Sequence, residues 1–266
     1  MGFLANMVAA TRATLSRPEY LAGLPTAMRG AKRSLREVVA GAGPRGALLA
    51  EFKRRSPGAT VPDLAQRTME SFVSQTAAAG IEGYSCLASG PEFGGGPSDV
   101  ADLVGRTSKP VLFKDFIVDP VQIEAAARAG ASAVLLIARL ELAGLLTTPL
   151  RALATAAHDR GLEVLLEWHG RAELRQTEDV PADVYGVNVR DLDTLEIRRR
   201  VGEETMRAAG AFHPLIGMSG VEGPEEARRF WDAGADGILV GTALARADDP
   251  RAFLESLRRT TSEERP

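Results

Sequence analysis

Short apolar runs rich in Val, Ile and Leu recur along the chain, separated by amphipathic stretches. The eight runs cover residues 47–52, 83–88, 110–113, 133–138, 163–167, 184–189, 214–218 and 237–240. They are continuous rather than alternating, which is typical of parallel strands covered on both faces. Helical patterns lie between them, and several begin with a proline in the first turn; they cover residues 62–79, 120–129, 142–159, 224–233 and 250–258.

A glycine shortly before four of the runs supports the same organisation. Gly80, Gly130, Gly161 and Gly234 each stand where a helix would end and turn into the next strand, a position that favours glycine. A doubly wound sheet of about five or six strands would leave some of the eight runs unexplained. The alternation therefore favours an α/β fold of the TIM (β/α)8 barrel class.

The first 45 residues precede this repeat and carry two helical patterns, over residues 3–16 and 26–40. They are too short for an independent domain. We therefore expect an N-terminal helical extension over residues 1–45 and a catalytic barrel over residues 46–260. The extension is expected to cover the barrel or to help close the mouth of its active site.

Composition narrows the function classes. The 266 residues are 45% hydrophobic and 25% charged, with a net charge of −3, so no general positive field attracts nucleic acid or a membrane surface. The richest apolar run ends at Arg139, too short to span a bilayer, and no basic residues precede the apolar N-terminus as a secretory signal requires. One cysteine, Cys86, and three histidines predict no disulfide, no metal site and a cytoplasmic location. The sequence does not decide between a monomer and a weak homo-oligomer.

Charged and amide side chains follow several of the predicted strands. In a TIM barrel the active site lies at these carboxyl ends. Glu51 and Lys53 alternate at the end of the first run, so both can point into the barrel mouth, although a structural ion pair is the alternative. Lys114 ends the third run and Glu167 the fifth. Only four of the 32 basic residues are lysines, and two of these four lie at strand ends.

Asn188 and Arg190 share one side of the sixth run and supply an amide and an anion-binding guanidinium. Beyond the fifth run, His169 is expected at the surface or behind the site, and Trp168 in packing. The last two strands end in Ser219-Gly220 and Gly241-Thr242. Small residues let backbone N–H groups approach an anion, and the loops after strands seven and eight are the usual phosphate site of such barrels, so we expect phosphate there rather than simple turns.

Three segments resemble the signatures of indole-3-glycerol-phosphate synthases. The segment Ala50-Glu-Phe-Lys-Arg-Arg-Ser-Pro57 is similar to the first-strand motif of the family. Residues 111–120, Val-Leu-Phe-Lys-Asp-Phe-Ile-Val-Asp-Pro, resemble the third-strand motif, and residues 186–192, Gly-Val-Asn-Val-Arg-Asp-Leu, the sixth. The resemblance runs in the right order over about residues 45–255. It implies conversion of 1-(2-carboxyphenylamino)-1-deoxyribulose 5-phosphate into indole-3-glycerol phosphate, in tryptophan biosynthesis, with loss of carbon dioxide and water.

The resemblance also implies a role for each site residue. Lys114 is expected to be the general acid at the ribulose carbonyl, because an ammonium has a labile proton that a guanidinium lacks. Glu51, Lys53 and Glu167 share the proton transfers of dehydration, and Asn188 holds substrate hydroxyl or carboxylate groups. The implied substrate-binding residues are Ser56, Phe93, Phe116, Arg190, Ser219, Gly220, Gly241 and Thr242. The reaction requires neither a metal nor an organic cofactor.

This chain departs from the family pattern at strand seven, where Met218 replaces the usual Glu before Ser-Gly. The second-strand loop is unusually rich in glycine, Phe113 stands where a basic residue is common, and Val189 where a polar one is common. Two alternatives therefore accompany the synthase: a related phosphosugar barrel enzyme, such as an isomerase or a specialised-metabolism paralogue, and a non-catalytic phosphosugar-binding paralogue. Two lysines and two glutamates at the strand ends argue against a pure binder.

Overall fold

A computed structural model describes residues 2–26, 33–55, 68–90 and 92–258. Eight parallel strands close into a barrel in chain order, β1 pairing with both β2 and β8. The strands are β1 (Ala47–Phe52), β2 (Gly83–Leu87), β3 (Val111–Lys114), β4 (Ala133–Ile137), β5 (Glu163–Trp168), β6 (Val184–Asn188), β7 (Leu215–Met218) and β8 (Gly237–Val240). The TIM barrel predicted from the apolar runs is confirmed.

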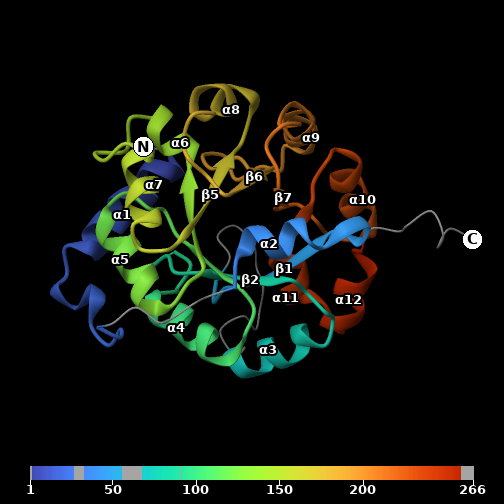
Figure 1. Cartoon of the computed structure of the whole chain (residues 1–266), viewed down its shortest axis with the longest axis horizontal. Helices are drawn as coiled ribbons and strands as arrows, with labels where there is room; N and C mark the ends of the chain where they lie inside the picture. Colours follow the sequence, from blue (N-terminus) through green and yellow to red (C-terminus); the bar gives the residue numbers. More distant parts are fainter. Residues whose placement is uncertain (1, 27–32, 56–67, 91, 259–266) are drawn as a thin grey trace, which may run out of the picture.

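Helices surround the barrel (Figure 1). They are α3 (Met69–Ala77), α4 (Pro97–Arg106), α5 (Pro120–Ala129), α6 (Ala138–Leu142), α7 (Leu150–His158), α8 (Arg171–Thr177), α9 (Arg199–Ala208), α10 (Pro224–Asp232), α11 (Thr242–Arg246) and α12 (Pro250–Ser256). As expected, Gly80, Gly130, Gly161 and Gly234 all have positive φ. In that region glycine avoids the strain of a side chain.

Each strand is buried on both faces, and its alternate residues join two different cores. On β1, Leu48 and Ala50 pack outward against the helices, whereas Ala47 and Leu49 pack inside the barrel. The same division holds around the sheet. The inner core includes Leu112, Ala133, Leu135, Leu165, Val184, Ile216 and Leu239. A strand with two apolar faces has no polar alternation, which explains the continuous runs in the sequence.

The N-terminal extension reaches both ends of the barrel. Helix α2 (Leu35–Ala40) closes the end at which the strands begin: Leu35 and Val39 join the inner core, and Glu163, the first residue of β5, accepts hydrogen bonds from the backbone N–H groups of Leu35 (2.7 Å) and Arg36 (3.1 Å). Figure 1 shows α2 across the middle of the ring.

Helix α1 (Phe3–Leu15) lies at the opposite end, where the strands finish. Leu4, Met7 and Val8 pack in the same cluster as Phe116 and other residues beyond the strand ends. The Arg12 guanidinium donates to the backbone oxygen of Leu145 (2.8 Å) in the loop after α6. The extension therefore both covers the barrel and borders its mouth.

Several element boundaries differ from the sequence expectations. The helix expected over 142–159 is confirmed as α7 over its second half, but its start is wrong, because α6 ends at Leu142, Gly144 has positive φ, and α7 begins only after Pro149. The helix expected over 26–40 is shorter where described, since α2 starts after its cap Ser34, and residues 27–32 lie outside the described residues. A short 3-10 turn, η1 (Pro18–Leu21), and a second, η2 (Gly43–Arg45), were not predicted.

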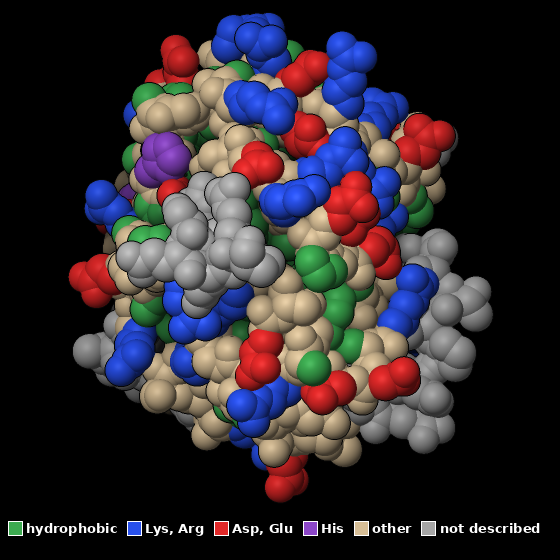
Figure 2. Space-filling view, turned by 90° about the vertical axis from the view of Figure 1, so that its right-hand side faces the viewer, with side chains coloured by type: hydrophobic (Ala, Val, Ile, Leu, Met, Phe, Trp, Pro, Cys, Tyr) green, Lys and Arg blue, Asp and Glu red, His purple; other side chains and the backbone are tan. Residues whose placement is uncertain are grey.

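The outer surface seen in Figure 2 mixes basic and acidic side chains. Ion pairs join neighbouring helices at α9 and α10, as between Arg229 and Glu203 (3.1 Å), and lie within single helices, as between Arg251 and Glu255 of α12 (2.8 Å). Interspersed charges of both signs cancel at a distance, so this face presents no strong field of one sign. Among the described residues, the helices are all too short or too polar to cross a membrane.

Candidate active site

The inner wall of the barrel changes from apolar to charged at the carboxyl ends of the strands. A pocket opens there, lined by residues from all eight strands or the loops that follow them, and by Phe3 of α1. Twelve of the thirteen residues expected in the site are described, and all twelve line this pocket: Glu51, Lys53, Phe93, Lys114, Phe116, Glu167, Asn188, Arg190, Ser219, Gly220, Gly241 and Thr242. Ser56 lies outside the described residues.

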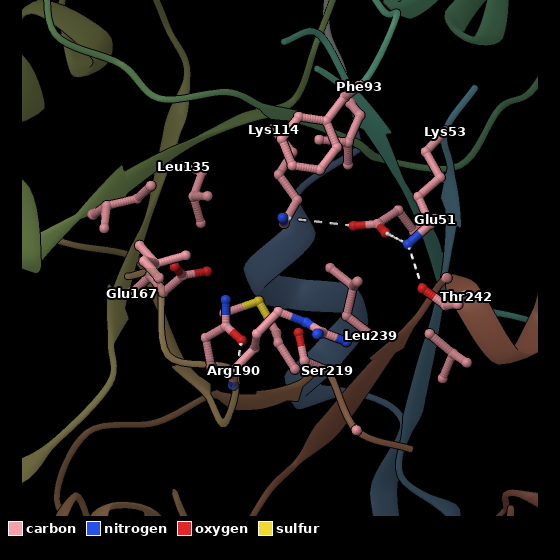
Figure 3. A pocket seen from close by; sticks show the side chains of 18 of the residues that line it. Glu51, Lys53, Phe93, Lys114, Leu135, Glu167, Arg190, Ser219, Leu239 and Thr242 are labelled. Carbon is pink, nitrogen blue, oxygen red and sulfur yellow. Dashed lines mark hydrogen bonds and ion pairs between the residues drawn. The ribbon is translucent and has the colours of Figure 1, made fainter. Parts of the chain in front are cut away.

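Glu51 joins the two lysines of the site. Its Oε1 lies 3.1 Å from Lys53 Nζ, and its Oε2 lies 3.6 Å from Lys114 Nζ (Figure 3). Glu51 on β1 and Lys53 just after it both point into the pocket, as the alternation predicted. Burial raises the pKa of Glu51, but the two ammonium groups outweigh burial and bring this pKa below its ordinary value. Glu51 is therefore an ionised carboxylate between two proton donors.

Lys53 is held from a second side by the first residue of α11, which follows β8. Its Nζ donates to Thr242 Oγ1 (2.7 Å), so a residue expected in phosphate binding also positions a lysine. Gly241 has a similar double role. A Cβ at this position would lie 2.3 Å from Glu51 Oε1 and 3.1 Å from Lys53 Nζ. Glycine at 241 thus leaves space for the Glu51–Lys53 pair, a constraint that the sequence analysis did not foresee.

Glu167 lies across the pocket from Glu51, with Lys114 between them (Figure 3). It is almost fully buried, at 1% side-chain exposure, and its Oε1 lies 3.2 Å from His169 Nε2. Its Oε2 is buried without a hydrogen-bond partner among the described residues. Burial raises the pKa of Glu167, but His169, Lys114 and Asn188 together bring it below its ordinary value.

Asn188 and Arg190 are positioned by the chain immediately after β6. The backbone N–H of Arg190 donates to Asn188 Oδ1 (3.1 Å), which orients the amide, and the Arg190 guanidinium donates to the backbone oxygen of Leu195 (2.8 Å). Burial lowers the pKa of Arg190, opposed by Glu222 and Glu51. In Figure 3, Arg190 and Ser219 lie on the side of the pocket opposite Lys114.

The loop after β7 has an unusual backbone. Ser219 has φ of 67° although it is not a glycine, and Gly220 has the same φ. Consecutive residues in this left-handed region form a sharp turn directly at the pocket. Left-handed backbone is uncommon outside glycine and is often retained at functional sites. The expected phosphate loops thus meet the pocket from β7 and β8.

Met218 is the last residue of β7 and is buried at the base of the pocket. A Cβ at Gly186 on neighbouring β6 would lie 2.5 Å from Met218 Cε. The absence of a side chain at 186 therefore provides the space that the methionine occupies. The thioether adds to the apolar part of the pocket wall, to which Leu239 of neighbouring β8 also belongs.

One of the two positions expected for His169 is confirmed: it lies behind the site rather than at the surface, because its side chain is 2% exposed and contacts Glu167. Apolar wall residues such as Leu135, Ile137 and Phe3 also line the pocket without having been predicted. The inward alternation of residues 133, 135 and 137 on β4 was the available signal. Trp168 packs in the outer core, stacked on Tyr185, as expected.

Comparison with known proteins agrees with this geometry. The family model for indole-3-glycerol phosphate synthase matches residues 5–257. Synthases of that name from Staphylococcus aureus strains JH1 and USA300 are 36% identical over 215 residues, which are 81% of this chain and 80% of theirs. Thiamine phosphate pyrophosphorylase from Pyrococcus furiosus shares the fold, with a TM-score of 0.59 and 18% identity over 84% of this chain and 96% of that chain. The chain belongs to the indole-3-glycerol phosphate synthase family.

Proposed function

We propose that this chain is an indole-3-glycerol-phosphate synthase. It closes the ring of 1-(2-carboxyphenylamino)-1-deoxyribulose 5-phosphate with loss of carbon dioxide and water. The observation that carries the proposal is the row Lys53–Glu51–Lys114, with contacts of 3.1 and 3.6 Å, in the same pocket as Glu167. Two ammonium donors and two carboxylate acceptors supply the proton transfers that the reaction needs.

Lys114 acts first, as general acid. The aromatic carbon that bears the carboxylate attacks the ribulose carbonyl carbon, and the carbonyl oxygen takes a proton from the Lys114 ammonium. Glu51 orients that ammonium without removing its charge. An ammonium can release this proton near neutral pH and a guanidinium cannot, so the two lysines are chemically distinct from the many arginines of the chain.

Decarboxylation and dehydration complete the product. Carbon dioxide leaves and its bonding electrons restore the aromatic ring. The new hydroxyl then leaves as water, which requires one proton added to that oxygen and one removed from the remainder of the ring system. A lysine supplies the first, and Glu167, an ionised carboxylate across the pocket, accepts the second. Two protons thus reach the departing oxygen and one is taken by Glu167. Lys53, through Glu51, passes replacement protons to the donor, and the one net proton that loss of carbon dioxide from a carboxylate consumes comes from solvent.

The remaining residues bind the substrate. Phe93 and Phe116, with ring centroids 6.3 Å apart, border the part of the pocket that suits the benzoate ring. Arg190 pairs with an anionic group of the substrate, and Asn188 holds a hydroxyl or carboxylate. The phosphate binds at the loops after β7 and β8, through Ser219, Gly220, Gly241 and Thr242. The substrate is a phosphorylated small molecule, and the residues named supply each proton without a metal or organic cofactor.

A related phosphosugar enzyme is the second candidate, because Met218 places a thioether where the family usually has a carboxylate. Incubation of the purified protein with the carboxyphenylamino substrate separates the candidates. Indole absorbance with release of carbon dioxide is the expected result. Conversion of the substrate without indole would favour the related enzyme, and binding without turnover would favour a non-catalytic paralogue. Either of these would overturn the proposal.

A further inference from the structure

Behind Glu167, four side chains of alternating charge form a row from the pocket to the surface. Glu167 Oε1 lies 3.2 Å from His169 Nε2, and His169 Nδ1 lies 3.2 Å from Glu173 Oε2. The other oxygen of Glu173 accepts from the Arg139 guanidinium. Glu167, His169 and Glu173 are 1–3% exposed, whereas Arg139 is 29% exposed. We call these four residues the His169 row.

Three elements build this row. Glu167 belongs to β5 and His169 lies two residues further, on the same side of the chain. Glu173 stands in the first turn of α8, and its Oε2 also accepts the backbone N–H of His169 (2.7 Å). Arg139 lies in α6, just after β4. One carboxylate therefore fixes both the main chain and the ring of His169, so that the imidazole cannot turn away from Glu167.

An imidazole between two buried carboxylates is stable as a cation. Burial disfavours that cation, but Glu167 and Glu173 outweigh burial and raise the pKa of His169 to about 9. The charged groups facing the row are Lys114 from β3, near Glu167, and Asp191 after β6, near Arg139. Burying these charged side chains costs solvation free energy, and the oppositely charged neighbours within the row offset that cost.

We propose that His169 is a positioning residue for the reaction, which holds the Glu167 carboxylate ionised and turned toward the pocket, with Glu173 and Arg139 fixing His169 in turn. This inference rests on the proposed function, since it assigns Glu167 the task of accepting a proton. The contact between Oε1 and His169 Nε2 is an ion pair at 3.2 Å and not a hydrogen bond, and the buried Oε2 has no hydrogen-bond partner among the described residues, as expected of an oxygen that meets the substrate.

The first test is the pH profile of kcat/KM for His169→Gln, compared with wild type. Glutamine can still donate a hydrogen bond but carries no charge. The pKa of Glu167 should rise, so the acid limb should move up by about one pH unit or more, with kcat reduced about 10- to 100-fold and KM changed much less. Glu173→Gln should move the same limb in the same direction by less. A residue with a merely structural role would not move this limb.

His158→Gln is the matched control. His158 also pairs with a carboxylate, Asp183 (2.8 Å), but outside the pocket, at the end of α7. Its substitution should leave the limb in place. A His169→Gln enzyme that folds by circular dichroism and keeps the wild-type acid limb would overturn the proposal. If Glu167→Gln itself keeps full activity, the proposed role of Glu167 fails instead, which separates the two failures.

The second test needs no turnover, so it applies even if a variant loses activity. The chain has three histidines, so their imidazole resonances can be assigned by NMR with His158→Gln and His213→Gln. We expect the His169 ring to remain an imidazolium at pH 8 in the wild-type protein, and to lose its proton at a lower pH in Glu173→Gln than in wild type. A neutral His169 ring at pH 7 in the wild-type protein would contradict the proposal.

Discussion

At the end where the strands begin, the barrel interior is apolar and α2 closes it; at the end where they finish, the same strands present charge. The change takes place within two residues along a strand. On β1, Leu49 belongs to the inner core and Glu51 to the charged row, and on β5, Leu165 and Glu167 divide in the same way. Two residues of strand span only about 6.6 Å. A continuous apolar base thus supports the charged groups from below and keeps water from one side of them.

The largest effect is expected at the charged end, on substituting the proton donor. Lys114→Arg keeps the charge but not the labile proton, so kcat should fall by about 10²–10⁴-fold, or about 3–5 kcal/mol of barrier. Substrate affinity should change far less. Steady-state kinetics measure both quantities, and Lys109→Arg is the control, because Lys109 donates to the backbone oxygen of Ile81 and does not line the pocket. A Lys114→Arg enzyme with most of the wild-type kcat refutes the assignment.

A substitution at the opposite end of the barrel should change the free energy of unfolding rather than the catalytic rate. Leu35 is fully buried where α2 meets the strand starts, so Leu35→Ala should lower the free energy of unfolding by about 2–5 kcal/mol. Well below its unfolding temperature, the variant should keep nearly wild-type kcat/KM. Urea unfolding and kinetics on the same preparation test this. Loss of kcat in a fully folded Leu35→Ala protein would show that the two ends are not independent.

The phosphate loops should distinguish backbone from side-chain binding. Gly241→Val blocks the approach of an anion and also displaces the Glu51–Lys53 pair, so it should weaken binding of a phosphate-containing product analogue and lower kcat together. Thr242→Ala removes one hydroxyl that Lys53 contacts, and should cost about 1 kcal/mol or less. Calorimetric Kd values of both variants for the phosphate-containing product analogue show whether the backbone or the side chain makes the larger contribution to binding. Equal and negligible losses would place the phosphate elsewhere.

The smallest change is expected where the two ends meet, at Met218. A thioether cannot exchange a proton, and the missing carboxylate weakens the electrostatic support for nearby ammonium groups. Met218→Glu should therefore raise kcat/KM on the carboxyphenylamino substrate by several-fold, on the order of 1 kcal/mol, with the fold unchanged. A highly active wild-type enzyme that loses activity on this substitution would show that methionine is a compensated variation.

The strands were largely predictable from the sequence because each apolar run reports local burial on two faces. Runs 47–52 and 237–240 match β1 and β8, whereas the helix expected from residue 142 begins only at Leu150, because the helical pattern hides a left-handed Gly144. The polar site residues were predictable because the active site of a TIM barrel lies at the carboxyl ends of its strands, and these residues all follow strands. The sequence left the position of His169 open, at the surface or behind the site, for the opposite reason. Its burial depends on Glu173 and Arg139, which come from two other elements, and no spacing along β5 reports them.

The central claim is that decarboxylating ring closure takes place at the charged end of the barrel. A single-turnover experiment, with enzyme in excess over the carboxyphenylamino substrate, tests it by following indole absorbance and carbon dioxide together in wild type, Leu35→Ala and Lys114→Arg. We predict one indole and one carbon dioxide per substrate in the first two, and bound but unconverted substrate in the third. Indole formed by Lys114→Arg at the wild-type rate, or no indole from the wild-type protein, would contradict the claim.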